Sequence, residues 1–191
     1  MTDNTATTRI SLLERDQVSP EIAAVYDALL KQRGVVPNMF KTLAHTPALA
    51  MGVAGFLKSL LSDGALPGWY KELVATRLSA LLRSGYAVAG HALSARQKGA
   101  SEAQIVAAQG DFECGPFTET EKLGFRCADR LHQSAGAVDD AFFAQLKSAY
   151  TDPQIVELVA TAAAFELFPR LVDGLRIPTT TIPESVAGKK A

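Results

Sequence analysis

Four side chains near the middle of the sequence have types and a spacing that suit proton-transfer chemistry. They are Glu72, Ser84, Tyr86 and His91, and all lie within residues 66–99. An imidazole exchanges protons near neutral pH, and a nearby carboxylate commonly fixes its tautomer. Hydroxyl groups can hydrogen-bond to a substrate carboxylate or to a developing oxyanion. This is the one group of residues in the chain whose pattern points to chemistry.

Two helices are expected to position these side chains. The apolar pattern predicts a first helix over Trp69–Leu82 and a second over Gly85–Lys98, closed by Gly99. Ser84 is a favourable N-cap for the second helix. Ser84 and His91 are seven residues apart, so they fall on one face of that helix.

This stretch resembles the carboxymuconolactone decarboxylase family, whose other branch contains the alkylhydroperoxidase-D-like proteins. The redox members of the family carry a Glu, a Cys-x-x-Cys pair twelve residues on, and a His four residues past the second Cys. This chain keeps Glu72 and His91 at the same spacing, but Ser84 and Ala87 stand where the two cysteines would be. Both sulfur atoms are therefore missing.

The resemblance extends over roughly residues 20–178 and is closest to the peroxidase-related members. Further short matches are Val36–Phe40, Leu66–Pro67, Phe117–Glu119, Ile155–Leu158 and Phe165–Arg170. The resemblance implies an alkylhydroperoxidase-D-like helical bundle with a central helical hairpin. It also implies a homo-oligomer, a trimer or hexamer, with the site near a subunit contact.

The remainder of the chain indicates an all-α protein. Helix-start signals recur along it, at Ser19–Pro20, Thr46–Pro47, Ser101, Thr118, Asp139 and Asp152–Pro153. No alternating pattern long enough for a strand occurs. A length of 191 residues fits one domain. We expect an N-terminal arm over 1–18, the helical domain over 19–178 and a C-terminal tail over 179–191.

Composition excludes several classes of partner. A net charge of −1 provides no basic surface for nucleic acid, and the sequence contains no apolar run long enough to cross a membrane. The polar N-terminus lacks a signal-peptide pattern, and Cys114 and Cys127 have no metal or redox spacing. We therefore expect a cytoplasmic protein without a metal or cofactor that acts on a small-molecule substrate.

The missing sulfur atoms bear on the reaction class. In the redox relatives, as the resemblance implies, the His and Glu relay protons to a cysteine whose thiolate attacks a peroxide or disulfide. A serine hydroxyl is far less acidic and cannot cycle through a sulfenic acid. Cys114 and Cys127 lie on a predicted loop and on another helix, away from His91. Peroxidase activity is therefore the least favoured reading.

The decarboxylase branch of the family implies a different chemistry, which needs no sulfur. Loss of CO₂ leaves electron density that must be stabilised and then protonated. We expect His91 to act as the acid/base and Glu72 to orient it, with Tyr86 and Ser84 as polar groups that contact substrate. The substrate would be a small lactone or carboxylate, and the reaction that of a carboxy-lyase.

Each of these residues also has a structural explanation. His91 can be a packing residue, Glu72 a first-turn residue favoured by the helix dipole, Tyr86 an aromatic plug and Ser84 only an N-cap. The alternative function is therefore a catalytically degenerate scaffold that binds a ligand or partner. An enclosed pocket with His91 in hydrogen-bond reach of Glu72 or Tyr86 would favour the enzyme, and His91 within apolar packing would favour the scaffold.

Overall fold

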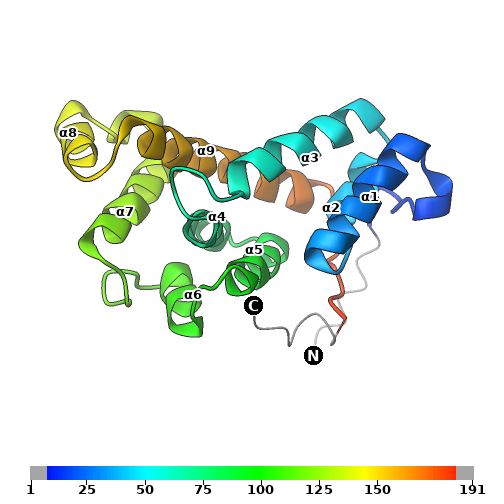
Figure 1. The fold of residues 1–191 in the computed structure, drawn as a ribbon, viewed down its shortest axis with the longest axis horizontal. Coiled ribbons are helices and arrows are strands. Elements are labelled where there is room, and N and C mark those ends of the chain that lie inside the picture. Colours follow the sequence, from blue (N-terminus) through cyan, green and yellow to red (C-terminus); the bar gives the residue numbers. More distant parts are fainter. Residues whose placement is uncertain (1–7, 184–191) are drawn as a thin grey trace.

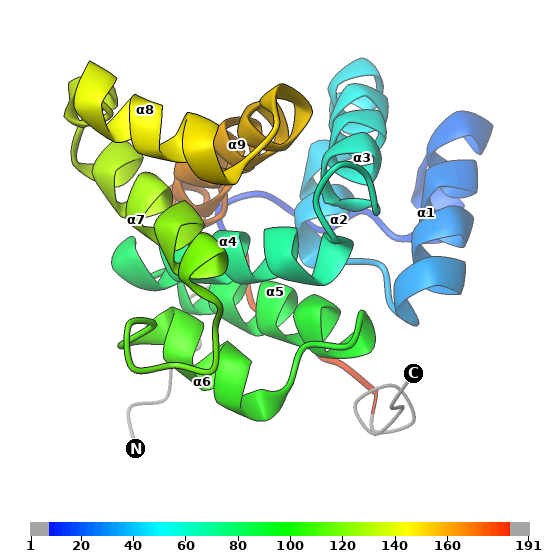
Figure 2. The same cartoon turned by 60° about the vertical axis from the view of Figure 1, so that its left-hand side comes forward.

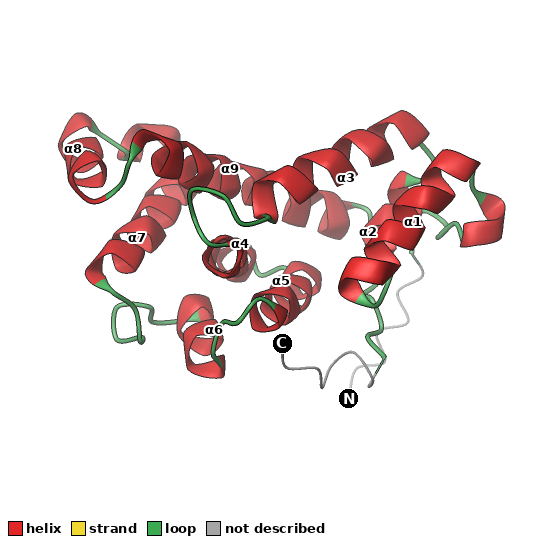
Figure 3. Ribbon diagram, viewed as in Figure 1, coloured by secondary structure: helices red, strands yellow, loops and turns green. Residues whose placement is uncertain are grey.

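The computed structural model describes residues 8–183, and every regular element in that range is a helix (Figure 3). The predicted all-α class is confirmed. The α-helices in the described range are α1 Pro20–Arg33, α2 Asn38–Leu43, α3 Pro47–Leu61, α4 Gly68–Leu81, α5 Gly85–Gln97, α6 Glu102–Gln109, α7 Glu119–Gln133, α8 Asp140–Ala149 and α9 Asp152–Gly174. Short 3-10 turns lie at Arg15–Gln17 and Ala135–Ala137.

Local sequence signals account for most helix boundaries. Proline stands in the first turn of α1, α3 and α9, where its missing N–H costs nothing. Ser101 and Thr118 each form a complete capping box at the start of α6 and α7. Gly34 closes α1 with a φ of 72°, a conformation that glycine adopts without strain. Pro169 lies inside α9, which continues to Gly174.

Helix α4 is the centre of the bundle. Figure 1 shows it end-on, with α5 and α6 on one side of it, α9 on the opposite side and α7 along its flank. Figure 2 shows α4 and α5 side by side, which confirms the predicted central hairpin. The sequence indicates one apolar side for α4, but the surrounding helices bury it on all sides. Even the charged residues Lys71 and Glu72 are inaccessible.

A buried ion pair links the central helix to α9. Lys71 Nζ donates to Glu157 Oε2 at 2.9 Å, and the lysine side chain is only 1% exposed. The Glu157 carboxylate also accepts from the backbone N–H groups of Ala65 and Leu66. These bonds satisfy a charge that would otherwise be costly to bury, and they fix the loop that leads into α4.

The N-terminal segment that the structure describes is attached to the domain. Leu13 donates its backbone N–H to Lys41 O, and Tyr26 Oη donates to Leu13 O at 3.0 Å. Glu14 pairs with Lys41 as well. Leu13 and Glu14, which belong to the expected N-terminal arm over 1–18, therefore contact α1 and α2. Residues 1–7 of that expected arm lie outside the described range.

Close packing around α7 gives a stability prediction. A Cβ at Gly124 would lie 2.1 Å from Tyr70 Oη and 2.8 Å from Tyr150 Oη. Both hydroxyls are held by backbone carbonyls of α7, so neither can move aside. Gly124→Ala should lower the free energy of unfolding by about 1–3 kcal/mol, measured by urea denaturation.

The matched control is Gly52→Ala in α3, where an added Cβ meets no atom within 4 Å. This change should raise stability by about 0.5–1 kcal/mol, because alanine favours the helix. Equal effects of the two substitutions would contradict the packing explanation.

Candidate active site

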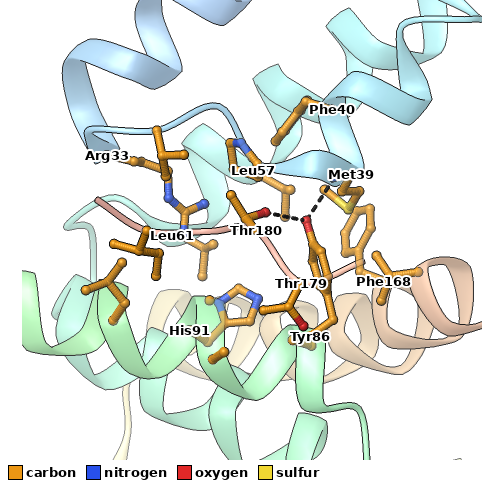
Figure 4. A pocket seen from close by; sticks show the side chains of 18 of the residues that line it. Arg33, Met39, Phe40, Leu57, Leu61, Tyr86, His91, Phe168, Thr179 and Thr180 are labelled. Atoms are coloured by element: carbon orange, nitrogen blue, oxygen red, sulfur yellow. Dashed lines mark hydrogen bonds between the residues drawn. The ribbon is translucent and has the colours of Figure 1, made fainter. Parts of the chain in front are cut away.

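A cavity lies beside α5, between the end of α1, helices α2, α3 and α9, and the C-terminal segment 179–182 (Figure 4). Its volume is about 80 Å³, counted as the space open to the centre of a water molecule. One water needs about 10–15 Å³ on this measure, so the cavity admits a small organic molecule. Most of its lining side chains are apolar, among them Met39, Leu57, Leu61, Phe165, Phe168 and Val172.

His91 projects from α5 into this cavity. Its Nδ1 lies 2.7 Å from Glu72 Oε2, and its ring packs edge-on against Phe165 with centroids 4.4 Å apart. The side chain is 13% exposed. No described residue hydrogen-bonds to Nε2, so this nitrogen is available to a molecule in the cavity. The structure thus places His91 in the lining of a cavity and within hydrogen-bond reach of Glu72.

Glu72 is a buried carboxylate with two hydrogen-bond partners. Oε2 faces His91, and Oε1 accepts a hydrogen bond from Lys98 Nζ at 2.7 Å. Burial by itself would raise the pKa of this carboxyl. The hydrogen bond with His91 and the positive charges around the carboxylate outweigh burial and lower the pKa to about 2. Glu72 is therefore an ionised hydrogen-bond acceptor and cannot serve as a free base.

Lys98 is a site residue that sequence reasoning missed. Its ammonium donates to Glu72 and to the carbonyl of Leu61 at the end of α3, at 2.7 Å in each case. It is the C-cap residue of α5 and follows His91 by seven residues, or two helical turns, so helical spacing places both on one side of the helix. That spacing was the signal that could have revealed it.

Tyr86 lines the cavity, but its hydroxyl is held by the backbone. Tyr86 Oη accepts from Met39 N at 2.9 Å and lies 3.4 Å from Thr180 Oγ1 (Figure 4). Burial raises the pKa of its phenol, so the group stays protonated. The structure thus brings Tyr86 to the cavity while giving its hydroxyl a role in joining α2, α5 and the C-terminal segment.

Ser84 does not reach the cavity, contrary to the expected contact with substrate. It is the N-cap of α5 by position, but its side chain makes no capping hydrogen bond. The residue is fully buried, and its Oγ has no partner among the described residues. Ser84 follows the tight turn from α4, in which its backbone N–H donates to Ser79 O, and it is not among the residues that line the cavity. Ala87, in contrast, lines the cavity.

The C-terminal segment forms part of the site. Thr179, Thr180 and Ile182 line the cavity, and Thr180 Oγ1 accepts from the backbone N–H of Asn38 at the start of α2. Asn38 Nδ2 also donates to Pro178 O at 3.0 Å. The domain limit expected at residue 178 therefore excludes residues that the cavity uses. Sequence alone gave no signal for them.

Neither cysteine belongs to the site. Cys127 is buried in α7, where burial raises the pKa of its thiol to about 11. Cys114 is exposed on the loop after α6, and its hydrogen bond with Asp111 raises its pKa. Raised pKa values oppose thiolate formation, and neither residue lines the cavity.

Two further findings concern the described residues as a whole. None of their helices combines the length and the apolar character needed to span a membrane. In residues 8–183 no group of three or more His, Cys, Asp or Glu side chains is arranged to hold a metal ion.

The sequence comparisons find one family model. The model of the carboxymuconolactone decarboxylase family matches residues 47–128, a range that begins at α3 and includes the α4–α5 hairpin with Glu72 and His91. This segment of the chain is similar to that family. No curated protein matches the sequence.

Solved structures show the same fold across nearly the whole chain. A peroxidase-related protein from Silicibacter sp. TM1040 has a TM-score of 0.86 at 16% identity, covering 99% of this chain and 98% of its own. A peroxidase-related protein with an alkylhydroperoxidase AhpD core, from Ralstonia eutropha JMP134, has a TM-score of 0.84 at 20% identity, covering 91% and 92%. The debrominase Bmp8 has a TM-score of 0.79 at 20% identity, covering 96% and 97%. The fold is thus alkylhydroperoxidase-D-like.

The depressed pKa of Glu72 predicts how stability depends on pH. Its pKa falls from the ordinary 4.5 to about 2 in the folded state, so its stabilising contribution is present above pH 4.5 and is lost as the pH falls toward 2. That contribution is on the order of 3 kcal/mol. The difference in unfolding free energy between wild type and Glu72→Gln should therefore shrink as the pH falls from 4.5 toward 2.

Urea denaturation at a series of pH values measures this difference. Glu102→Gln is the matched control, because Glu102 pairs with Arg96 on the exposed surface, where ion pairs contribute little. If the difference in unfolding free energy between wild type and Glu72→Gln is as large at pH 2 as at neutral pH, the charge of the carboxylate is not what stabilises the folded state.

Proposed function

We propose that this protein is a non-redox acid/base enzyme that acts on a small lactone or carboxylate through His91. The observation that carries the proposal is the arrangement of the imidazole. Its Nδ1 is bonded to a buried ionised carboxylate at 2.7 Å, and its ring lines an otherwise largely apolar cavity. A fixed tautomer with one nitrogen facing a substrate-sized space is what general acid/base catalysis requires.

The roles of the residues follow from the hydrogen bonds. Glu72 accepts a hydrogen bond from Nδ1–H, so Nε2 is the atom that takes or gives a proton at the substrate. In a decarboxylation, the C–C bond electrons remain on the substrate carbon when CO₂ leaves, and Nε2–H of the imidazolium protonates that carbon. The neutral imidazole then regains a proton from solvent. Glu72 is a positioning residue, because it acts through His91.

Two observations favour this chemistry over thiol chemistry. The positions where the redox relatives carry cysteines are Ser84 and Ala87, and the two cysteines of the chain lie outside the cavity.

A solved structure of a cysteine-to-alanine variant of the debrominase Bmp8 contains 2,3,4-tribromopyrrole. That complex supports a small cyclic compound as the type of ligand that this fold accepts.

Substitution at the site tests the proposal. Turnover of carboxylated lactones is followed by CO₂ release, and His91→Gln should lower kcat/KM by about 10²–10⁴-fold. Glu72→Gln should lower it by about 10–100-fold and change the pH profile, because the imidazole loses its acceptor. The double variant Cys114→Ser/Cys127→Ser should retain wild-type turnover.

Other results would point elsewhere. Saturable binding without turnover in wild type would favour the catalytically degenerate scaffold. Dithiol-dependent peroxide consumption that disappears in the double cysteine variant would establish thiol chemistry and exclude the acid/base mechanism as the main activity.

A further inference from the structure

Among the described residues that line the cavity, Arg33 alone has a permanently charged side chain. It is the last residue of α1, and Figure 4 shows its guanidinium extending into the cavity from the side opposite His91. No Asp or Glu of the described chain lines the same space. An arginine in an otherwise apolar cavity is therefore a feature to be explained.

The hydrogen bonds of Arg33 leave most of its donors unused. Arg33 Nη2 donates to the hydroxyl of Ser94 on α5, and within residues 8–183 no carboxylate forms an ion pair with Arg33. A guanidinium has five N–H donors in a planar fork. Arg77 illustrates the usual arrangement in this fold, since Asp129 accepts from both Nε and Nη2 at 2.8 Å.

The surrounding charges do not neutralise Arg33. Glu72 is close enough for the arginine to influence its pKa, but its two oxygens already accept from His91 and Lys98. The adjoining groove shares Arg33 with the cavity and adds the ammonium group of Lys58. This end of the molecule therefore carries an excess of positive charge directed at an apolar space.

We propose that Arg33 binds the carboxylate of the ligand, so that the cavity selects small organic acids with an apolar body. The free N–H groups of Arg33 match the two oxygens of a carboxylate. The apolar body then contacts side chains that line the cavity, such as Leu57 and Phe168. The inference rests on the proposed function for the site and adds the charged group that its ligand must carry.

Matched acids and amides test this contact. Benzoate and benzamide have the same ring and nearly the same shape, but only benzoate carries a charge. Isothermal titration should show tighter binding of benzoate to wild type. Arg33→Leu should lower the affinity for benzoate by about 10–100-fold. Its affinity for benzamide should stay within about two-fold of the wild-type value. Arg33→Lys, which keeps the charge without the fork, should lie between wild type and Arg33→Leu.

Lys58→Leu is the control for long-range charge. Lys58 lies on α3 and lines the adjoining groove but not the cavity, so its loss should change benzoate binding by no more than about two-fold. Benzamide binding to each variant reports that the cavity is intact, so an unfolded variant is recognised.

Three results would overturn the inference. They are equal affinity of wild type for benzoate and benzamide, undiminished benzoate binding by Arg33→Leu, and an equal loss in Lys58→Leu. Failure of benzoate, cyclopentanecarboxylate and 2-furoate to bind wild type at millimolar concentration would overturn it as well.

The His91→Gln variant separates this inference from the proposed function. It should bind benzoate within about two-fold of wild type while losing turnover. Acid binding that depends on Arg33, together with turnover that does not depend on His91, supports the inference and refutes the proposed function. If turnover depends on His91 but acid binding does not depend on Arg33, the inference is refuted and the proposed function is retained.

Discussion

The site depends on one buried negative charge, the carboxylate of Glu72. An isolated carboxylate in this position would be strongly unfavourable, and two donors on α5 compensate it. His91 and Lys98 each contribute one hydrogen bond of 2.7 Å. Because Lys98 also binds the carbonyl of Leu61, the charge connects α3, α4 and α5. Removal of any of these groups would leave another buried polar group without its partner.

This constraint has a direct consequence for chemistry. The imidazole of His91 cannot rotate freely while Nδ1 faces Glu72 and the ring packs against Phe165. The nitrogen that remains, Nε2, has no partner among the described residues, and its side chain lines a largely apolar cavity. A low-dielectric surrounding strengthens every electrostatic contact made there.

The positions of the missing cysteines differ in their surroundings. Ala87 contributes to the cavity lining, where a small side chain leaves space for a ligand. Ser84 is fully buried, and its hydroxyl lacks a partner among the described residues. An unsatisfied buried hydroxyl costs about 1–3 kcal/mol, so stability does not explain a serine at this position. Nothing in the structure does.

The sequence by itself determined most helix starts and drew attention to Glu72 and His91. Proline and capping-box signals are local, so they define where α1, α3, α6, α7 and α9 begin. The spacing of Glu72 and His91 across a short turn is also local, and it brought both residues to notice. The resemblance to the family supplied the hairpin, because its motif lies within that same stretch.

Only the tertiary structure decided what surrounds that pair. Arg33, Phe165 and Thr180 come from the end of α1, from α9 and from the C-terminal segment, far apart in sequence. Their proximity depends on how the helices pack around α4, and no periodicity encodes it. Packing likewise kept Ser84 out of the cavity lining and buried Glu72 between His91 and Lys98. Long-range contacts set burial, and burial sets which polar groups face a ligand.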